Sequence, residues 1–320
     1  MNLSDFSLTI EAFPLAIANK QAISLWIARA DKVHPLASGN KLYKLLPNIE
    51  YAKQYNYSQL LSFGGAFSNH IHALALYSAS VGLQSVAIIR GEKEYVSNPT
   101  LSAAIKAGMK LEFVDRASYK RRYDADYLQQ LQQQYPDALI IPEGGSSELA
   151  LQGCTELMQQ INYHCLLQKN SMPDVVTVAC GTGMTFSGLV NGAKSYQNIQ
   201  GYLVVKDDSV YQKVDSLLGK YTQNKNYKIQ PADFGGYAKF DAALLYFILD
   251  VLEQTEVLLD PIYTSKMCRC VIEQIKTGRF KAGSKLLMLH SGGLQAWYGM
   301  KDKVIRIAGH KAWQKIVVYL

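Results

Sequence analysis

The stretch VVTVACGTGMTFSG, residues 175–188, contains the pattern that best indicates the fold class of this chain. A run of apolar, mostly β-branched residues ends at Ala179, a glycine-rich turn follows, and a helical pattern begins at Thr185. Because the apolar run is continuous and does not alternate with polar residues, it predicts a strand covered by helices on both faces. The stretch therefore predicts one strand–turn–helix unit of an α/β protein with a parallel sheet.

The same unit recurs along the 320-residue chain. Expected strands are Gln59–Ser62, Ser85–Arg90, Leu111–Asp115, Ala138–Ile141, Val175–Ala179, Tyr202–Val205, Val257–Leu259 and Leu286–Leu289. Expected helices are Asn69–Val81, Thr100–Ala107, Tyr123–Tyr135, Glu148–Leu167, Thr185–Ser195, Asp241–Gln254 and Ser265–Thr277. This alternation predicts an α/β fold with two open, twisted, mostly parallel sheets flanked by helices.

Composition narrows the class of protein. No apolar run reaches the length of a membrane span, and the N-terminus lacks a basic start followed by an apolar run, so we expect a cytoplasmic protein. The five cysteines form no zinc-like pair, which favours reduced structural thiols and no metal site. The net charge is +7, yet the densest basic run is only Lys120–Arg122, so we expect no nucleic-acid partner. A mild positive field suits an anionic substrate and a phosphate cofactor.

Four expected strands end in glycine-rich turns, at Gly64–Gly65, Gly144–Gly145, Gly181–Gly183 and Gly292–Gly293. Ligands of open α/β sheets bind at the carboxyl ends of strands, so four such turns would line one cleft if the fold brings them together. The turn Cys180-Gly-Thr-Gly-Met-Thr185 resembles a phosphate cradle, because glycines let an anion approach the backbone N–H groups of a helix start. It is neither a full dinucleotide fingerprint nor a Walker loop.

Two further segments carry reactive side chains. Lys41 follows Gly39 and Asn40 in a turn, where a lysine of lowered pKa can form an imine with an aldehyde. A lysine in a turn is usually a surface residue, and Lys44 has the same chemistry without such a frame. The segment Ser68-Asn69-His70 begins an expected helix, and either Ser68 or Asn69 can serve as its cap or can hold a ligand.

Taken together and in order, six motifs resemble the family of D-cysteine desulfhydrase and 1-aminocyclopropane-1-carboxylate (ACC) deaminase. The motifs are Asn40-Lys41-Leu-Tyr-Lys, Gly64-Gly-Ala-Phe-Ser-Asn-His70, Ile141-Pro-Glu-Gly-Gly-Ser146, Gly181-Thr-Gly-Met-Thr185, Asp260-Pro-Ile-Tyr-Thr-Ser-Lys266 and His290-Ser-Gly-Gly293. Members of this family are pyridoxal 5'-phosphate (PLP) enzymes of the tryptophan synthase β-subunit fold. The resemblance covers about residues 34 to 300.

The resemblance implies a role for each matching residue. Lys41 would hold PLP as a Schiff base and later move a proton, and Asn69 would bond the ring oxygen of PLP. Ser68 would hold the substrate carboxylate or act as a nucleophile, and Tyr263 would exchange a proton with the substrate. The phosphate would be held by Gly181, Thr182, Gly183, Met184 and Thr185, Ser291 would lie near the pyridine nitrogen, and His70 and Tyr237 would adjoin the substrate.

Ser291 indicates the kind of reaction that the resemblance implies. A hydroxyl opposite the pyridine nitrogen does not stabilise a protonated ring as a carboxylate would, which makes the cofactor a weaker electron sink. This suits β-elimination better than transamination. We therefore expect a PLP-dependent lyase that converts D-cysteine, or a related β-substituted amino acid, into pyruvate, ammonia and sulfide.

Other functions stay open on the sequence alone. ACC deaminase is the first alternative, although the family's deaminases carry a tyrosine where this chain has Met288, and a thioether cannot exchange a proton. A PLP-binding protein without turnover is the second. A dinucleotide-dependent oxidoreductase is a distant third, because the glycine fingerprint is incomplete and no acidic ribose partner is evident.

The expected architecture has two α/β domains. Residues 45–150 would form the smaller domain, and residues 1–44 together with 151–320 would form the larger, cofactor-binding domain. PLP would lie between them with Lys41 near the crossing, and the tail Val304–Leu320 would add an edge strand. The family resemblance implies a homodimer.

Overall fold

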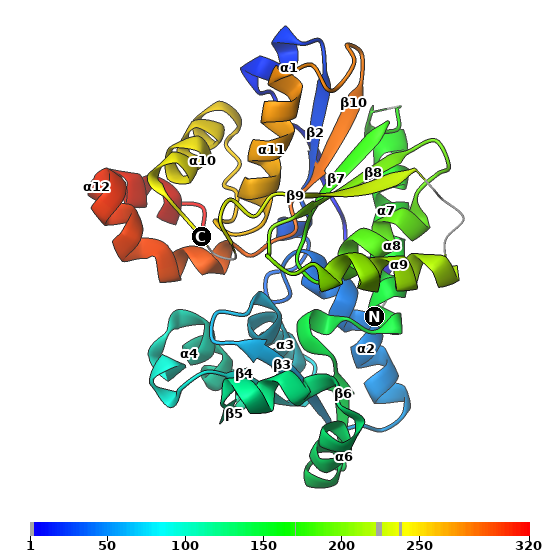
Figure 1. The fold of residues 1–320 in the computed structure, drawn as a ribbon, viewed down its shortest axis with the longest axis vertical. Coiled ribbons are helices and arrows are strands. Elements are labelled where there is room, and N and C mark those ends of the chain that lie inside the picture. The colour runs from blue at the N-terminus through cyan, green and yellow to red at the C-terminus, as the bar shows by residue number, and fades with distance from the viewer. Residues whose placement is uncertain (1–2, 170, 222–225, 237–238) are drawn as a thin grey trace.

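Two sheets form the framework of the computed structural model, which describes residues 3–169, 171–221, 226–236 and 239–320. The larger sheet has the strand order β1-β2-β10-β7-β8-β9 and is parallel except for the pairing of β1 with β2. Its strands are β1 (Ile10–Ala12), β2 (Ser24–Ala28), β7 (Val175–Cys180), β8 (Asn198–Leu203), β9 (Tyr227–Pro231) and β10 (Lys285–Leu289). This sheet fills one half of the molecule in Figure 1.

The smaller sheet fills the other half and is entirely parallel, with the order β5-β4-β3-β6. Its strands are β3 (Gln59–Gly65), β4 (Gln84–Arg90), β5 (Lys110–Val114) and β6 (Ala138–Ile141). The two sheets and their helices confirm the predicted fold class. All four strands of this sheet fall inside the predicted small domain. The predicted boundaries of that domain, at residues 45 and 150, lie within helices and stay a prediction.

Helices cover both faces of each sheet, as the continuous apolar strands require. In β10, Leu287 and Leu289 face the cluster that contains α7 and α8, while Leu286 and Met288 face the cluster that contains α10 and α11. The longer helices are α2 (Asn40–Gln54), α3 (Asn69–Ser80), α4 (Pro99–Lys106), α6 (Ala125–Gln134), α7 (Glu148–Lys169), α8 (Met184–Gly192), α9 (Ser209–Tyr221), α10 (Ala242–Thr255), α11 (Thr264–Lys276) and α12 (Lys301–Val317). The short helices α1 (Ala16–Lys20) and α5 (Arg116–Lys120) and the 3-10 helices η1 to η6 complete the described elements.

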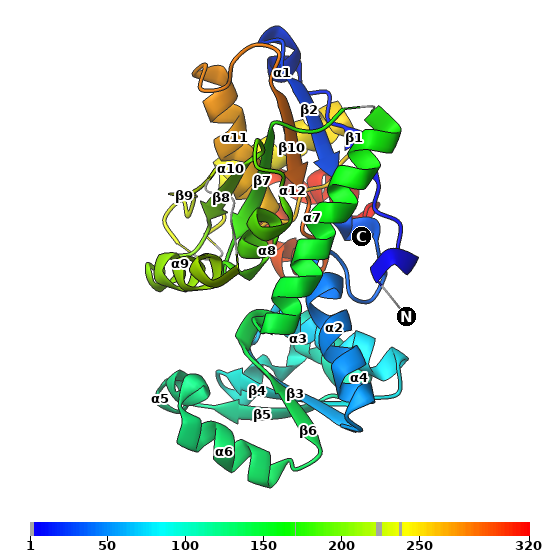
Figure 2. The ribbon, with the colours of Figure 1, turned by 90° about the vertical axis from the view of Figure 1, so that its right-hand side faces the viewer.

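Helix α2 belongs to both halves of the molecule. Its apolar residues Leu42, Leu45 and Ile49 are fully buried in a core cluster that extends from α7 and α8 to α3. Figure 2 shows α2 beside the lower end of α7, next to the small sheet. The first residues of α2 therefore lie at the junction between the two sheets, where the sequence analysis placed Lys41.

One predicted strand is wrong. Residues 257–259 are buried and apolar but form no ladder with any described strand. Their carbonyl groups accept hydrogen bonds from side chains instead: the Leu258 carbonyl from His290 Nε2 at 2.9 Å, and the Leu259 carbonyl from Trp297 Nε1 at 3.0 Å. An apolar run predicts that a segment is buried, but it does not predict a neighbouring strand. Here the buried backbone carbonyl groups bond to side chains instead of to another strand.

The predicted edge strand at Val304–Leu320 is also wrong, because α12 extends to Val317. The helix is kinked at Gly309, whose φ is 81°. Val304 is buried before the kink, and Ala312 and Ile316, four residues apart after it, lie on one helix face. The sequence analysis also missed the short strands β1, β2 and β9 and treated the start of α2 as a turn.

The five cysteines are free thiols, as expected from their spacing. Among the described residues, no group of three or more histidine, cysteine or acidic side chains is arranged to hold a metal ion. Within the same part of the chain, every helix is too short or too polar to cross a bilayer.

A close backbone contact joins the start of α2 to the end of β10. Gly39 has a φ of 72°, and a Cβ atom there would lie 1.9 Å from the Ser291 carbonyl oxygen. The Asn40 N–H also donates to this oxygen at 3.2 Å. The contact therefore admits only glycine at position 39.

We predict that Gly39→Ala lowers the free energy of unfolding far more than Gly82→Ala. Gly82 has a similar φ of 77°, but no atom lies within 4 Å of its Cβ position. Gly82→Ala should cost only the left-handed backbone, about 1 kcal/mol, whereas Gly39→Ala adds overpacking of about 1–3 kcal/mol. Urea unfolding of both variants measures the difference, and equal losses would contradict the proposed contact.

Candidate active site

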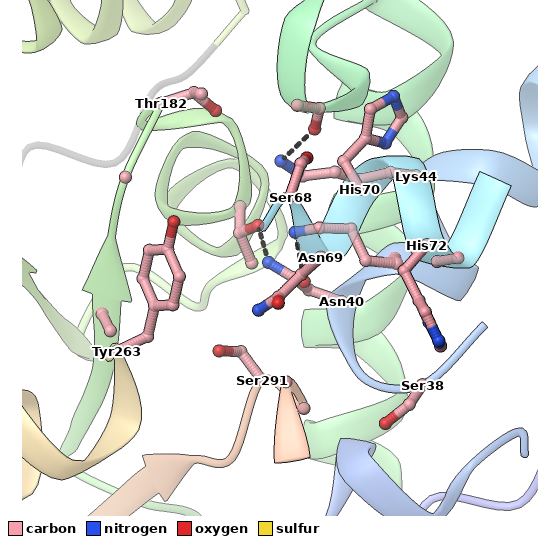
Figure 3. A pocket seen from close by; sticks show the side chains of 18 of the residues that line it. Ser38, Asn40, Lys44, Ser68, Asn69, His70, His72, Thr182, Tyr263 and Ser291 are labelled. Carbon is pink, nitrogen blue, oxygen red and sulfur yellow. Dashed lines mark hydrogen bonds between the residues drawn. The ribbon is translucent and has the colours of Figure 1, made fainter. Parts of the chain in front are cut away.

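The four glycine-rich turns meet in one cavity of about 760 Å³ between the two sheets. Its lining includes Gly65, Gly144, Gly181 and Gly292, one from each turn, which confirms the predicted convergence. The volume falls in the range of small-molecule sites, about 300–1,000 Å³. Figure 3 shows Asn40, Asn69, Tyr263 and Ser291 arranged around this space.

Lys41 is the second residue of α2 and lines the cavity. Its Nζ atom donates to Asn40 Oδ1 at 2.9 Å, and Asn40 Nδ2 donates to Thr185 Oγ1 at 2.8 Å. The amide of Asn40 thus connects the amine to the glycine loop that begins α8. These bonds fix the amine over the cavity floor.

Burial is the main reason that the pKa of Lys41 falls to about 7. The nearby cation of Lys44, one helical turn along α2, lowers this pKa further. An amine with a pKa near neutrality is largely unprotonated at physiological pH and can attack a carbonyl group. Lys41 therefore has the property that imine formation requires.

The sequence analysis left Lys44 without a special environment, and the structure corrects this. Its side chain is only 3% exposed and lines the same cavity. Its Nζ atom donates to the Gly144 carbonyl at 3.1 Å, and burial lowers its pKa. A signal in the sequence could have identified Lys44 as a cavity residue. Lys41 and Lys44 are one helical turn apart, so if Lys41 faces a glycine-lined cleft, Lys44 faces it too.

The loop from Cys180 to Thr185 has the form of an anion cradle. Gly183 has a φ of 82° and precedes α8, whose first N–H groups have no partner within the helix. A Cβ atom at Gly183 would lie 2.5 Å from Val214, and one at Gly181 would lie 3.2 Å from the Tyr263 ring. Only glycine therefore leaves the backbone N–H groups open to the cavity.

Thr182 and Met184 of this loop differ in what they can offer a ligand. Thr182 Oγ1 accepts a hydrogen bond from Ser146 at 3.0 Å, so its own hydroxyl hydrogen can donate to a ligand. The Met184 side chain packs against Ala150 and Leu151 and does not line the cavity. Met184 can contribute only its backbone N–H group to a ligand.

Ser68 and Asn69 stand at the start of α3 on the opposite wall. Ser68 caps the helix, because its Oγ atom accepts from the Ile71 N–H at 3.3 Å. Asn69 Oδ1 accepts from Gln295 Nε2 at 2.8 Å, and a Cβ atom on Gly293 would lie 2.6 Å from Asn69 Nδ2. Asn69 is thereby held against the last glycine turn. The sequence analysis missed Gln295.

His70 lies deeper in the same wall and is 2% exposed. Ser62 Oγ donates to the Ile141 carbonyl at 2.8 Å, so His70 Nε2 donates to Ser62 Oγ at 2.8 Å. This leaves Nδ1 as an acceptor, and no described residue bonds to it. Burial and the cations of Lys41 and Lys44 lower the pKa of His70, so the ring is neutral.

Tyr263 and Ser291 form the part of the cavity that belongs to the large sheet. Tyr263 precedes α11, and Asp260 holds its backbone by accepting from the Tyr263 N–H at 2.7 Å. The ring lies against Gly181, as described above. The side chains of Tyr263 and Ser291 both line the cavity.

Two other positions from the sequence analysis have different outcomes. Met288 is fully buried in the core between β10 and α11 and does not line the cavity. A proton donor at this position would face the core, so Met288 carries no argument against ACC deaminase. Tyr237 lies outside the described residues.

A family model described as "Pyridoxal-phosphate dependent enzyme" matches residues 17–292, most of the chain. The chain belongs to this family of pyridoxal-phosphate dependent enzymes. PLP is therefore its cofactor, as predicted. The residues around the cavity fit PLP, because a low-pKa lysine and a glycine cradle for a phosphate line the same space.

Similar proteins carry names from one group of these enzymes. A bifunctional D-cysteine desulfhydrase/ACC deaminase of Arabidopsis thaliana is 28% identical over 92% of this chain and 78% of its own length. A D-cysteine desulfhydrase of Serratia proteamaculans is 26% identical over 86% of this chain and 88% of its own. A solved ACC deaminase homologue has a TM-score of 0.81 at 23% identity, covers 94% of both chains and supports the fold.

We predict that Lys41 titrates near pH 7 in the apoprotein and that Lys44→Met raises its pKa. A neighbouring cation disfavours a second positive charge, so its removal must move the pKa upward. NMR of ¹³C-methylated lysines in the apoprotein measures the titration. Lys53→Met removes an exposed lysine from the same helix and should leave the pKa of Lys41 in place; an unchanged or lower value in Lys44→Met would contradict the coupling.

Proposed function

We propose that the protein is a PLP-dependent lyase that eliminates the β-substituent of a small amino acid, with D-cysteine as the representative substrate. The observation that carries this proposal is one cavity that joins a lysine of lowered pKa to a phosphate cradle, a capped helix start and a tyrosine. The names of the Serratia and Arabidopsis relatives support the substrate. A homodimer and a cytoplasmic location stay predictions.

Lys41 would serve both as the anchor of the cofactor and as the base. When bound, PLP supplies an electron sink for the charge that develops at Cα of the substrate. Lys41 would act as a base through its Nζ atom once that atom is not bonded to the cofactor. The burial that lowers its pKa then keeps this atom unprotonated and ready to accept the Cα proton.

Lys44 would balance the charge of the phosphate. The glycine loop offers N–H groups and the Thr182 hydroxyl, and Lys44 has donors left after its one bond to the Gly144 carbonyl. A buried ammonium group with one neutral partner is costly unless an anion accompanies it. A bound phosphate would supply that anion.

The opposite wall would orient the substrate. The Ser68 hydroxyl and the first N–H groups of α3 form a site suited to the substrate carboxylate, because helix starts favour anions. Tyr263 lies across the cavity and would give a proton to the departing group. Ser291 would face the pyridine nitrogen without charging it, which favours elimination over transamination.

ACC deamination is the second candidate function, since the Arabidopsis relative is named for both activities. Met288 faces the core and offers no reason to set this candidate aside. In the deaminase reaction, Ser68 would act as the nucleophile. The two activities therefore place different demands on one hydroxyl group. A PLP-binding protein without turnover is the outcome if no amino acid reacts.

We predict that Lys41→Ala abolishes the visible absorption band that wild-type protein acquires with PLP. The variant lacks the amine that bonds the cofactor, so both the band and turnover should disappear. Lys53→Met, an exposed change on the same helix, should retain both. Absorption spectra recorded with added PLP measure the effect. A band that persists in Lys41→Ala would show that another lysine holds the cofactor.

Ser68→Ala should separate the two candidate reactions. If Ser68 only holds the carboxylate of D-cysteine, its loss should raise KM about tenfold, equivalent to a hydrogen bond of about 1.4 kcal/mol. If it is the nucleophile of ACC opening, 2-oxobutanoate formation should stop.

Sulfide and pyruvate from D-cysteine, and 2-oxobutanoate from ACC, are the products to measure. Asp115→Ala removes another helix cap, outside the cavity, and controls for the stability lost with the Ser68 cap. Wild-type protein that binds PLP but converts neither substrate, nor any amino acid in a panel of both enantiomers, would refute the lyase proposal.

A further inference from the structure

The active-site cavity is lined by more basic than acidic side chains even when Lys41 and Lys44, which the proposed chemistry uses, are set aside. Among the described residues, the other basic side chains of the lining are Arg29, Lys32, Arg90, Arg122 and Lys213, and the acidic ones are Asp31, Glu143 and Asp207. Arg29, Lys32 and Arg122 form ion pairs with acidic side chains. Arg90 and Lys213 form none with any residue in the described part of the chain.

Arg90 lines the cavity beside the loop that contains Gly65. It is the last residue of β4 and pairs in register with Gly65 of β3. A guanidinium nitrogen of Arg90 lies 3.7 Å from the position that a Cβ atom on Gly65 would take. Since Gly65 has no side chain, the guanidinium group adjoins the backbone of the loop that leads to Ser68.

The neighbours of Arg90 hold it in place without neutralising it. Its guanidinium carbon lies 5.5 Å from the centre of the Tyr119 ring. Tyr119 donates to one oxygen of Glu143 at 2.6 Å, and Arg122 donates to the other at 2.7 Å. The carboxylate of Glu143 is therefore engaged by these two groups. The charge of Arg90 faces the cavity, and no acidic side chain within the described ranges forms an ion pair with it.

The opposite rim adds a second cation. Lys213 lies on α9, a helix in the half of the molecule that contains the large sheet. Its Nζ atom lies 5.5 Å from the ring centre of Tyr123, which lies in the half that contains the small sheet. Both side chains line the cavity. Each half of the molecule thus contributes to the cavity a cation without an ion pair among the described residues, and this charge attracts a ligand with more than one negative group.

We propose that Arg90 binds an anionic group on the side chain of the substrate. The α-carboxylate is assigned to Ser68 and the start of α3, so an anion at Arg90 must be a second one. A guanidinium group binds sulfate and phosphate oxygens with two parallel hydrogen bonds. The substrate class is then an amino acid whose β-substituent is an anionic leaving group.

This inference rests on the proposed elimination. For serine O-sulfate, the Cα–H bond breaks first, and the Cβ–O bond then breaks as sulfate departs with the bonding electron pair. The resulting enamine takes up one water molecule and gives pyruvate and ammonium. No oxidant or reductant is required.

The test compares serine O-sulfate with β-chloroalanine, whose leaving group carries no charge before it departs. Both enantiomers of each are supplied to the PLP-loaded enzyme, and pyruvate is measured. The ratio of kcat/KM for the sulfate ester to that for the chloride should fall about tenfold in Arg90→Gln, as expected for one charge-assisted hydrogen bond in a half-open site. Arg121→Gln removes the same charge from a residue that does not itself line the cavity and should retain the ratio.

Binding supplies a readout that does not depend on turnover. Calorimetric titration of the Lys41→Ala protein with serine O-sulfate should show weaker binding when Arg90→Gln is added, whereas alanine binding should change less. An unchanged ratio, or an equal change in Arg121→Gln, would overturn the role of Arg90. Turnover of β-chloroalanine without any turnover of the sulfate ester would also overturn it, while failure of both would refute the lyase proposal itself.

Discussion

The contact between Gly39 and Ser291 is the constraint on which the site depends. It joins the segment before α2 to the turn after β10 with no space for a side chain on one partner. Through this contact, Lys41 is positioned relative to the large sheet, while the rest of α2 packs against α7 and α3. Asn40 adds a second connection by bonding Thr185 of the glycine cradle. The reactive amine and the phosphate cradle are therefore placed by adjacent residues.

The electrostatics of the cavity follow from burying two lysines one helical turn apart. The cation of Lys44 disfavours a charge on Lys41, and burial lowers the pKa of both. Lys41 uses this effect, since a neutral amine is the reactive form. For Lys44, burial makes the charged form unfavourable until an anion is bound. The same geometry thus activates one lysine and prepares the other for a phosphate group.

The fold class and the location of the cavity could be predicted from the sequence. Units of strand, glycine turn and helix indicate an α/β fold, and ligands of such folds bind at the edge of the sheet where these turns lie. The positions of Lys41, Ser68, Asn69, Thr182, Tyr263 and Ser291 around one cavity agree with that reading. Burial was harder to predict. Residues 257–259 are as apolar as a strand yet bond side chains, and the direction of Met288 depends on strand register, which a motif does not specify. Arg90 is ordinary in sequence, and only its tertiary neighbours distinguish it, whereas the spacing of Lys44 from Lys41 was a signal that required the helix to be recognised first.

The position of α2 in both halves of the molecule has a mechanical consequence. Its start is fixed to the large sheet through Gly39 and Asn40, and its length packs mainly against α7 and, to a smaller extent, against α3 of the small sheet. Ser68 and Arg90 belong to the small sheet and its helices, whereas the glycine cradle precedes α8 of the large sheet. A relative movement of the two sheets would therefore change the width of the cavity and would strain the contacts that α2 makes with both α7 and α3.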